Sequence, residues 1–350
     1  MNLGSGAFGS VIADGDYAIK QFTELRCLIN EVFVARYVDM VSKGSYAIHL
    51  KKCSFSKLTM TVERWHCSLD SAMKIGLTKT QCLSIHKCIL KGLAIIEQIW
   101  IVHADLKPAN ILVDHTYTKA VITDFGISST SGSAKVKLTS PAFSPLKDGV
   151  KNHRTHDAFA LVLLTMQLFY NYKINRVIET KAELRRIIAT TVTDLKMRNV
   201  LTMLVQEDET KSWTCRMALM ELYNEDVYQP LPVIEIYKPP IPNPRIDSIV
   251  DTCVNFLRTK YYINKSLRCT QCITSLVSRL DLSEKKVKIY ASSMMYMFFS
   301  IFGTYEWIEK NKRMKLIDVL NYAGCTEKDL TTCLNTVMSH DDIVELMFAP

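Results

Sequence analysis

Apolar residues in the first part of the chain fall in short runs that change from strand-like to helical spacing and back. Residues 11–12 and 17–20 read as two short strands, and the Asp-Gly-Asp turn at 14–16 joins them into a predicted hairpin. Apolar positions then recur at helical spacing over 24–38. The run 58–65 is again β-rich. These segments predict both strands and helices for this part of the chain.

The C-terminal part has a different pattern, in which apolar residues repeat at helical spacing. Helices are predicted over 246–258, 266–280, 285–302 and about 314–323, where the helix stops at Gly324, and a fifth starts at Thr326. Asp329, three residues later, gives that fifth helix a capping-box-like start. The third helix is nearly apolar in its later half, so we expect it to be buried on all sides.

A proline-rich segment separates the two patterns. Six of the ten prolines fall between Pro230 and Pro244, which favours an extended linker over a helix or a central strand. A chain of 350 residues is also long enough for more than one domain. We therefore expect a first domain over residues 1–225, a linker over 226–245 and a small all-α domain over 246–350.

Composition sets several classes of function aside. The formal net charge is +8, but the basic residues are dispersed, so no nucleic-acid partner is expected. The run 289–302 is too short and too interrupted by serine to span a bilayer, so no membrane role is expected. Eleven cysteines without a signal peptide indicate an intracellular location, in the cytoplasm or nucleus. Cys269 and Cys272 form a lone CxxC inside an apolar helix, which favours core residues over zinc ligands.

Polar residues of the kind found in active sites cluster in the middle of the chain. Residues 103–114 read HADLKPANILVD, and Asp124-Phe125-Gly126 follows soon after. Phosphoryl transfer from a nucleotide needs a carboxylate to orient the attacking hydroxyl, a cation near the phosphate, and a carboxylate with an amide oxygen for metal ions. Asp105, Lys107, Asn110 and Asp124 supply these four groups. Taken alone, such a match could equally be a polar loop without chemistry.

A glycine-rich segment near the N-terminus removes most of that ambiguity. Residues 3–11 read LGSGAFGSV, with Gly4, Gly6 and Gly9 in a GxGxxGxV arrangement. Glycine lets backbone amides approach phosphate oxygens because no Cβ intervenes. The dinucleotide-binding fingerprint also contains GxGxxG, but it opens a helix, whereas strand-like residues follow here.

Together these motifs resemble those of the eukaryotic protein kinase family. The tetrapeptide YAIK at 17–20 is similar to the family's VAIK, and a lysine two residues after Asp105 is typical of its serine/threonine members. The resemblance implies the two-lobed α+β kinase fold, with an N-lobe over about 1–65 and a C-lobe over about 66–225. It also implies transfer of the γ-phosphoryl group of ATP to a hydroxyl of a protein substrate, with Mg²⁺ bound beside the nucleotide.

The resemblance also assigns catalytic and metal-binding roles. Asp105 is the expected catalytic base, Lys107 is expected to contact the γ-phosphate, and Asn110 completes the catalytic set. Asn110 and Asp124 are the expected Mg²⁺ ligands. Asp157, in a segment that resembles the family's DxWxxG helix, is expected to brace the backbone of the catalytic loop.

The nucleotide site implied by the resemblance extends over the N-lobe. Lys20 is the expected partner of the α- and β-phosphates, and Glu31 is its expected ion-pair partner. Glu24 is the alternative partner, and Glu31 could instead be a solvated helix residue. Val62 would be the gatekeeper before a hinge at 63–65, and a ribose contact is expected at Ser68 or Asp70. The expected ATP-binding residues are Leu3, Gly4, Ser5, Gly6, Ala7, Phe8, Gly9, Ser10, Val11, Ala18, Lys20, Glu31, Val62, Glu63, Trp65 and Ser68.

Several positions depart from the family pattern. Ala104 stands where most members carry an arginine that grips a phosphorylated activation loop. We therefore expect that activity does not need a loop phosphate and that alanine at both Thr139 and Ser140 lowers it only slightly. Lys147 and Ser212 replace the two halves of a buried ion pair, and losing both together avoids an uncompensated buried charge.

The C-terminal helices resemble a single cyclin box, although a generic helical bundle explains them equally well. Lys286 matches the cyclin lysine, but Leu334 stands where the cyclin glutamate would be. This part is a possible intramolecular or protein partner of the kinase domain. The compact loops also resemble kinases of large DNA viruses, which would place the protein in an infected host cell. A pseudokinase scaffold and a kinase for small molecules or lipids are the rival functions.

Overall fold

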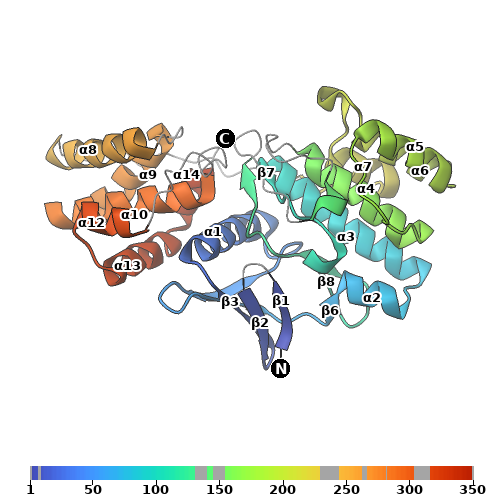
Figure 1. Ribbon diagram of the computed structural model, residues 1–350, viewed down its shortest axis with the longest axis horizontal. Coiled ribbons are helices and arrows are strands. Elements are labelled where there is room, and N and C mark those ends of the chain that lie inside the picture. The colour runs from blue at the N-terminus through green and yellow to red at the C-terminus, as the bar shows by residue number, and fades with distance from the viewer. Residues whose placement is uncertain are drawn as a thin grey trace.

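The computed structural model describes residues 2–6, 9–130, 140–144, 154–228, 244–261, 266–280, 282–302 and 316–348. Figure 1 shows a β-sheet lobe, a helical lobe and a group of C-terminal helices, with helix α1 between the last group and the rest. We call the described residues from 244 to 348 the helical module. The two lobes are the α+β arrangement that the sequence predicts.

The N-lobe is a five-stranded antiparallel sheet with one helix packed beside it. Its elements are β1 (Asn2–Gly6), β2 (Gly9–Asp14), β3 (Tyr17–Phe22), α1 (Leu25–Ser42), β4 (Leu50–Ser54) and β5 (Thr59–Glu63), and the strand order is β1-β2-β3-β5-β4. The predicted hairpin is β2–β3, and Gly15 in its turn has a φ of 58°, a conformation that glycine adopts without strain.

The C-lobe places short strands and loops on a framework of helices. Its helices are α2 (Leu69–Ile75), α3 (Lys79–Gln98), α4 (Thr155–Tyr170), α5 (Lys181–Thr191), α6 (Leu195–Leu204) and α7 (Cys215–Tyr223), and its strands are β6 (Cys67–Ser68), β7 (Ile101–Val102), β8 (Ile111–Val113), β9 (Ala120–Ile122) and β10 (Ser129–Thr130). A capping box of Thr78 and Gln81 starts α3. Gly92 lets α3 approach β9 closely, because a Cβ there would lie 2.9 Å from Ile122 Cδ1. Strands β7 and β9 therefore pack directly on α3.

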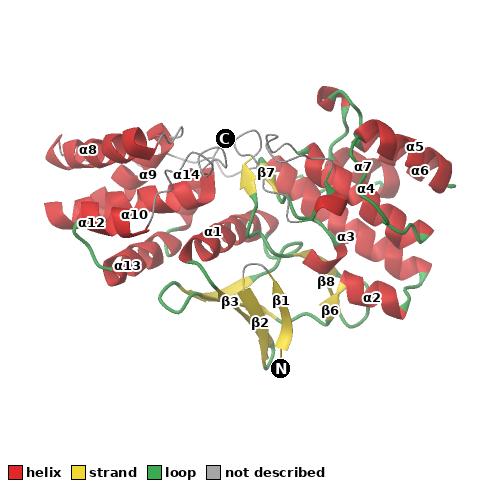
Figure 2. Ribbon diagram, in the orientation of Figure 1, coloured by secondary structure: helices red, strands yellow, loops and turns green. Residues whose placement is uncertain are grey.

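The helical module is built around one central helix. It comprises α8 (Pro244–Tyr261), α9 (Ser266–Arg279), α10 (Glu284–Phe302), α12 (Leu316–Ala323), α13 (Glu327–Met338) and α14 (Asp341–Phe348). α10 packs against α8, α9, α12 and α13, as its apolar sequence predicts, and the described part of the module has helices and connecting loops but no strand (Figure 2). Thr326 and Asp329 form the capping box expected at the start of α13. Cys269 and Cys272 are buried in α9 as core residues.

The sequence prediction missed α14. This helix has only eight residues, too few for an amphipathic period to stand out from the preceding helix. Its Asp341 and Asp342 lie in the first turn, where acidic side chains stabilise a helix. Within the described residues, no helix has both the length and the apolar character needed to cross a membrane.

Helix α1 is enclosed on every side. The sequence predicts a helix over 24–38, and the observed helix runs from Leu25 to Ser42, with 13 of its 18 residues buried. A helix on the surface of a lobe would keep a polar stripe in solvent. Instead, α1 lies between the sheet and α3 on one side and helices α10 and α14 of the module on the other (Figure 1).

Candidate active site

The loop between β7 and β8 is held by a carboxylate of α4. Asp157 is buried, and its two carboxylate oxygens accept the backbone N–H groups of His103 at 2.7 Å and Ala104 at 2.9 Å. Ala104 has a φ of 68°, which is unfavourable for a residue with a Cβ. The two hydrogen bonds fix this conformation, so Asp157 braces the loop as the sequence predicts.

His103 joins this loop to the segment before Asp124. Its Nδ1 accepts the N–H of Asp105 at 3.3 Å, and its Nε2 lies 2.9 Å from the carbonyl oxygen of Thr123. Because Nδ1 is an acceptor, Nε2 carries the hydrogen and donates it to Thr123. The ring also packs against Phe125, with centroids 5.1 Å apart. Asp105 and Asp124 are thereby placed relative to each other through one buried imidazole.

The three residues of the expected catalytic set are in direct contact. Asp105 is buried, and its Oδ2 accepts hydrogen bonds from Lys107 Nζ at 2.7 Å and Asn110 Nδ2 at 2.9 Å. Asn110 Nδ2 also donates to the backbone oxygen of Asp105 at 2.8 Å. The carboxylate is thus held in one orientation beside a cation, which is the geometry that a residue orienting a hydroxyl group needs.

Lys20 lies between two carboxylates. Its Nζ is 2.7 Å from Glu31 Oε2 and 2.8 Å from Asp124 Oδ1. Burial by itself would lower the pKa of Lys20, but attraction by Glu31 and Asp124 outweighs burial and raises it. Burial also raises the pKa of Glu31, against the attraction of Lys20. Glu24, the alternative partner, is the exposed N-cap residue of α1. Sequence spacing therefore identifies the ion pair of Lys20 correctly.

The glycine-rich segment forms the β1–β2 hairpin. Gly9 has a φ of 149°, and a Cβ there would lie 1.8 Å from the carbonyl oxygen of Gln21, so only glycine fits between β2 and β3. A Cβ on Gly4 would meet nothing within 4 Å, which leaves open space on that side of β1. Ala7 and Phe8 lie outside the described residues.

The remaining expected nucleotide contacts lie along the hinge and the sheet. Val62 is buried on β5 and pairs with Ala18 of β3. After β5, Trp65 Nε1 donates to Glu63 Oε1 at 3.0 Å. Ser68 is the N-cap residue of α2, and its hydroxyl accepts the N–H of Ser71. That hydroxyl has a structural role in addition to the ribose contact expected of it.

Sequence reasoning missed two polar residues beside this site. The Oγ of Ser140 accepts a hydrogen bond from Lys107 Nζ at 2.8 Å, although the sequence suggests only a loop hydroxyl there. Asn30, next to Glu31, donates its amide hydrogens to backbone carbonyls after Asp124. A second polar side chain beside Glu31, among apolar residues on both sides, is the signal that would have identified Asn30.

The ligands expected for Mg²⁺ are compatible with that ion. Asn110 uses its amide nitrogen to bind Asp105, which leaves its amide oxygen for a cation. Asp124 is 28% exposed in the site, so its carboxylate is accessible. Magnesium prefers oxygen ligands and is bound through one or two carboxylates together with substrate phosphates. Accordingly, the described residues contain no cluster of three or more His, Cys, Asp or Glu side chains that would form an all-protein metal site.

The Ser140 contact changes the expected effect of substitutions in this loop. We expect Ser140→Ala to lower kcat roughly ten- to a hundredfold, because a hydrogen bond to a charged group is worth roughly 1.5–3 kcal/mol. Phosphatase treatment of the wild type should change the rate less than twofold, since Ala104 has no charge to bind a phosphate. Initial rates of the treated, untreated and variant enzymes measure both effects. A large loss after phosphatase treatment would show that another cation binds a loop phosphate.

The buried ion pair of the family, expected at positions 147 and 212, is replaced at position 212 by a hydrogen bond of a serine. Ser212 is buried, and its hydroxyl donates to the backbone oxygen of Gln206 at 3.4 Å, while Lys147 lies outside the described residues. Nearby, Glu97 Oε2 on α3 accepts the N–H of Cys215 at 2.6 Å. Burial of the Glu97 carboxylate raises its pKa to about 8. A protonated acid therefore anchors the start of α7 at neutral pH.

This buried acid predicts a pH dependence of stability. The folded state holds the proton on Glu97 up to about pH 8, whereas the unfolded state releases it near the ordinary pKa of glutamate, so unfolding becomes easier as pH rises between these values. Glu97→Gln removes the titrating group, and its amide oxygen can still accept the N–H of Cys215. We expect the variant to gain stability over the wild type by up to about 1.4 kcal/mol per pH unit across that range. Urea unfolding of both proteins at pH 5, 7 and 9 gives the comparison, and a constant difference at all three values would contradict it.

Comparison with known proteins agrees with this geometry. The model of the protein kinase domain matches residues 1–272, which extends past residue 225 through α8 and into α9. The serine/threonine-protein kinase pakH of Dictyostelium discoideum is 33% identical over 150 residues, which cover 36% of this chain and 27% of the relative. The match therefore spans about a quarter of that relative's length. Since the model of the protein kinase domain covers most of the sequence, the chain belongs to the protein kinase family.

Proposed function

We propose that the protein is a serine/threonine kinase that transfers the γ-phosphoryl group of ATP to a hydroxyl of a protein, with Mg²⁺. The observation that carries this proposal is the paired arrangement around Lys20 and Asp105. Lys20 is bonded to both Glu31 and Asp124, and Asp105 is bonded to Lys107. A scaffold that had lost catalysis would have no need to keep these charges buried against each other.

Each residue has a defined task in the proposed reaction. The Asp105 carboxylate accepts the hydroxyl proton as the hydroxyl oxygen forms its bond to the γ-phosphorus, and the bond to the β-phosphate oxygen breaks to leave ADP. Lys107 lies beside Asp105 and offers positive charge to the transferred group. Lys20 would hold the α- and β-phosphates. Mg²⁺, when bound by Asn110 and Asp124, supplies positive charge to the phosphate oxygens.

The direct test is incorporation of labelled phosphate. The full chain is incubated with labelled ATP, Mg²⁺ and a generic basic protein, and the phosphorylated residue is identified by acid hydrolysis. We expect labelled phosphoserine or phosphothreonine, and no incorporation when EDTA removes the metal. Binding of ATP without incorporation into any protein would favour the scaffold function instead.

We further propose that the helical module is the intramolecular partner of α1, with the kinase domain ending near residue 225, a linker over 226–245 and the module beyond it. Three contacts support this. Tyr37 stacks on Phe348 with ring centroids 4.7 Å apart, and Arg36 binds Asp341 at 2.8 Å. The Arg26 guanidinium lies 5.1 Å from the centre of the Phe299 ring. These contacts extend from Arg26, near the start of α1, to Tyr37.

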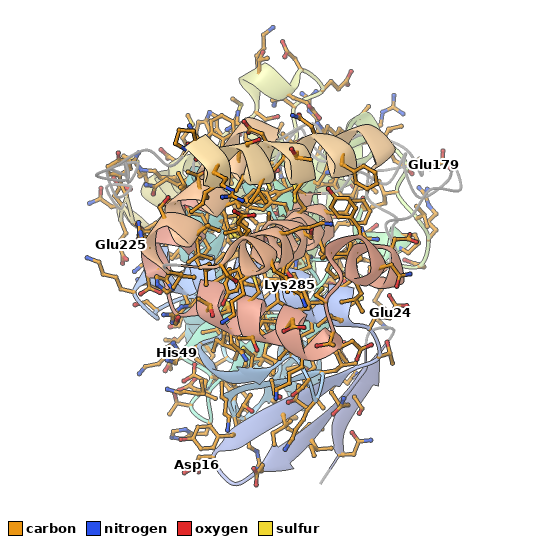
Figure 3. The ribbon with its side chains drawn as sticks, turned by 90° about the vertical axis from the view of Figure 1, so that its left-hand side faces the viewer. Asp16, Glu24, His49, Glu179, Glu225 and Lys285 are labelled. Carbon is orange, nitrogen blue, oxygen red and sulfur yellow. The ribbon has the colours of Figure 1, made fainter. Side chains whose placement is uncertain are left out.

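The view from the side of the module shows how it covers the kinase lobes. In Figure 3 the helices of the module, with Lys285 near the centre of the view, lie in front of the lobes, and the hairpin ending at Asp16 extends below them. The resemblance to a cyclin box remains part of the proposal. Lys286 is exposed, and Leu334, at the position of the cyclin glutamate, is buried in the module's own core. A contact through that lysine and glutamate is therefore not how this module meets α1.

Two stacked aromatic pairs allow a matched test of this role. Phe348 stacks on Tyr37 of α1, whereas Phe256 stacks on Tyr322 within the module at 4.2 Å. We expect Phe348→Ala to lower kcat roughly five- to tenfold, because an aromatic pair is worth about 0.5–1.5 kcal/mol beyond its buried area and its loss loosens α1. Phe256→Ala should keep kcat within twofold. Equal kcat values for both variants would leave the module as a localisation or substrate-recruiting domain.

A further inference from the structure

Asn30 is a buried residue of α1 whose amide nitrogen is surrounded by backbone carbonyls of the segment after Asp124. Its Nδ2 donates to the carbonyl oxygens of Phe125 at 3.1 Å, Gly126 at 2.9 Å and Ser128 at 3.2 Å. An amide nitrogen carries two hydrogens, so two of the three carbonyls share one. The three acceptors also fix the orientation of the amide, because its oxygen at that place would face three oxygens.

The amide oxygen of Asn30 makes no compensating hydrogen bond within the described part of the chain. Asn30 Oδ1 is buried and has no hydrogen-bond partner among the described residues. A buried unsatisfied acceptor destabilises a fold, so an apolar side chain would be preferred here if packing were the only requirement. Ile29 and Val32, on the same helix, are fully buried and apolar. The amide is therefore explained by the carbonyls that its donor end holds.

The same segment is anchored elsewhere by neutral contacts. Ser128 Oγ donates to the carbonyl oxygen of His103 at 3.0 Å. Strand β10 pairs with β7, next to the catalytic loop, and α10 of the helical module packs on β10. The side chain of Ala104 brings no charge to this region. Asp124 itself is held by its ion pair with Lys20, whereas the described hydrogen bonds of Phe125, Gly126 and Ser128 come from an amide and a hydroxyl.

We propose that Asn30 is a positioning residue that locks the segment 124–130 to α1. A neutral amide then replaces the cation that binds a phosphorylated loop in kinases with arginine at the position of Ala104. This inference rests on the proposed kinase activity. Glu31 orients Lys20, and Asn30 orients the backbone that follows Asp124. Consecutive helical residues point about 100° apart, so a single orientation of α1 about its axis allows the contacts of both Asn30 and Glu31. The helical module, which packs on the other side of α1, keeps the helix in that orientation.

Asn30→Leu in the full chain is the sharpest variant, because leucine has a similar volume and no donor. Thr165→Val is the matched control, since it removes buried hydrogen bonds to Leu161 and His86 in the C-lobe, away from the segment. The readouts are kcat, KM for ATP, the melting temperature and hydrogen exchange of a peptide covering 124–130. We expect Asn30→Leu to lower kcat at least tenfold and to speed exchange in that peptide at least tenfold. Thr165→Val should change neither more than twofold.

The exchange readout separates this inference from the proposed function. Faster exchange over 124–130 in Asn30→Leu, with the rest of the C-lobe unchanged, supports the positioning role even if no substrate is phosphorylated by the wild type. Unchanged exchange in that peptide, or a kcat within twofold of the wild type, would overturn it. If Asn30→Leu does not fold, Asn30→Ala, which adds no bulk, is measured in the same way and judged by the same limits.

Discussion

Asp105→Asn is expected to lower kcat by roughly 10²–10⁴-fold, the usual contribution of a positioned general base, while the KM for ATP and the melting temperature stay nearly constant. Asparagine has the shape of aspartate, and its oxygen can still accept the hydrogen bonds that Lys107 and Asn110 donate at 2.7 and 2.9 Å. It cannot accept a proton from the substrate. Initial rates with labelled ATP and a thermal melt of both proteins measure the two halves of this prediction.

Asp194→Asn is the matched control for this substitution. Asp194 is the N-cap residue of α6, where its side chain accepts the N–H of Met197, and asparagine caps helices as well as aspartate does. We expect the control to keep both turnover and stability. Near-normal turnover of Asp105→Asn with unchanged stability would mean that another group accepts the proton.

Lys20→Met should abolish detectable transfer, and it should also destabilise the fold. The sequence suggests that the fold would stay intact, because lysine does not belong to an apolar core. In the structure Lys20 is largely buried between Glu31 and Asp124. Removing one partner of a buried charge cluster leaves the others uncompensated, at a cost of about 3–5 kcal/mol.

Two measurements on Lys20→Met distinguish these effects. The rate with saturating ATP reports the loss of catalysis, and a melt at pH 6 and pH 8 reports the loss of stability. Burial raises the pKa of Glu31, so without Lys20 its protonation at low pH relieves the repulsion with Asp124. The variant should therefore be closer to the wild type in stability at pH 6 than at pH 8. If Lys20→Met had the melting temperature of the wild type at both pH values, the remaining carboxylates would not destabilise the fold.

The parts of the site that sequence predicts correctly are those encoded at short separation. Asp105, Lys107 and Asn110 lie within six residues in the sequence, so their contacts follow from one loop conformation. Lys20 and Glu31 are 11 residues apart, and a strand followed directly by a helix leaves few alternatives for the pair. The capping box of α13 is equally local.

The contacts that the sequence does not predict are made to backbone groups far away in the sequence, or by elements whose neighbours the sequence does not identify. Asn30 binds carbonyls 95 to 98 residues away, and a carbonyl group has no side-chain identity to detect. Ser140 contacts Lys107 across 33 residues, and the sequence between them contains no pattern that places the two side chains together. The packing of α10 and α14 on α1 is invisible for a related reason: a helix that is apolar all round predicts burial but not the identity of its neighbour.

The ion pair of Arg36 and Asp341 joins positions 305 residues apart, and this separation has a consequence for biosynthesis. A ribosome adds about 5–20 residues per second, so the outer face of α1 waits roughly 15–60 s before α14 has been made. Until then Tyr37 and its apolar neighbours are open to solvent and to other nascent chains. Contacts between residues so far apart in the sequence also slow folding itself, because they raise the contact order. We expect the yield of this protein to rise with slower growth or added chaperone, and nascent chains to be most prone to aggregation while the helical module is still being translated.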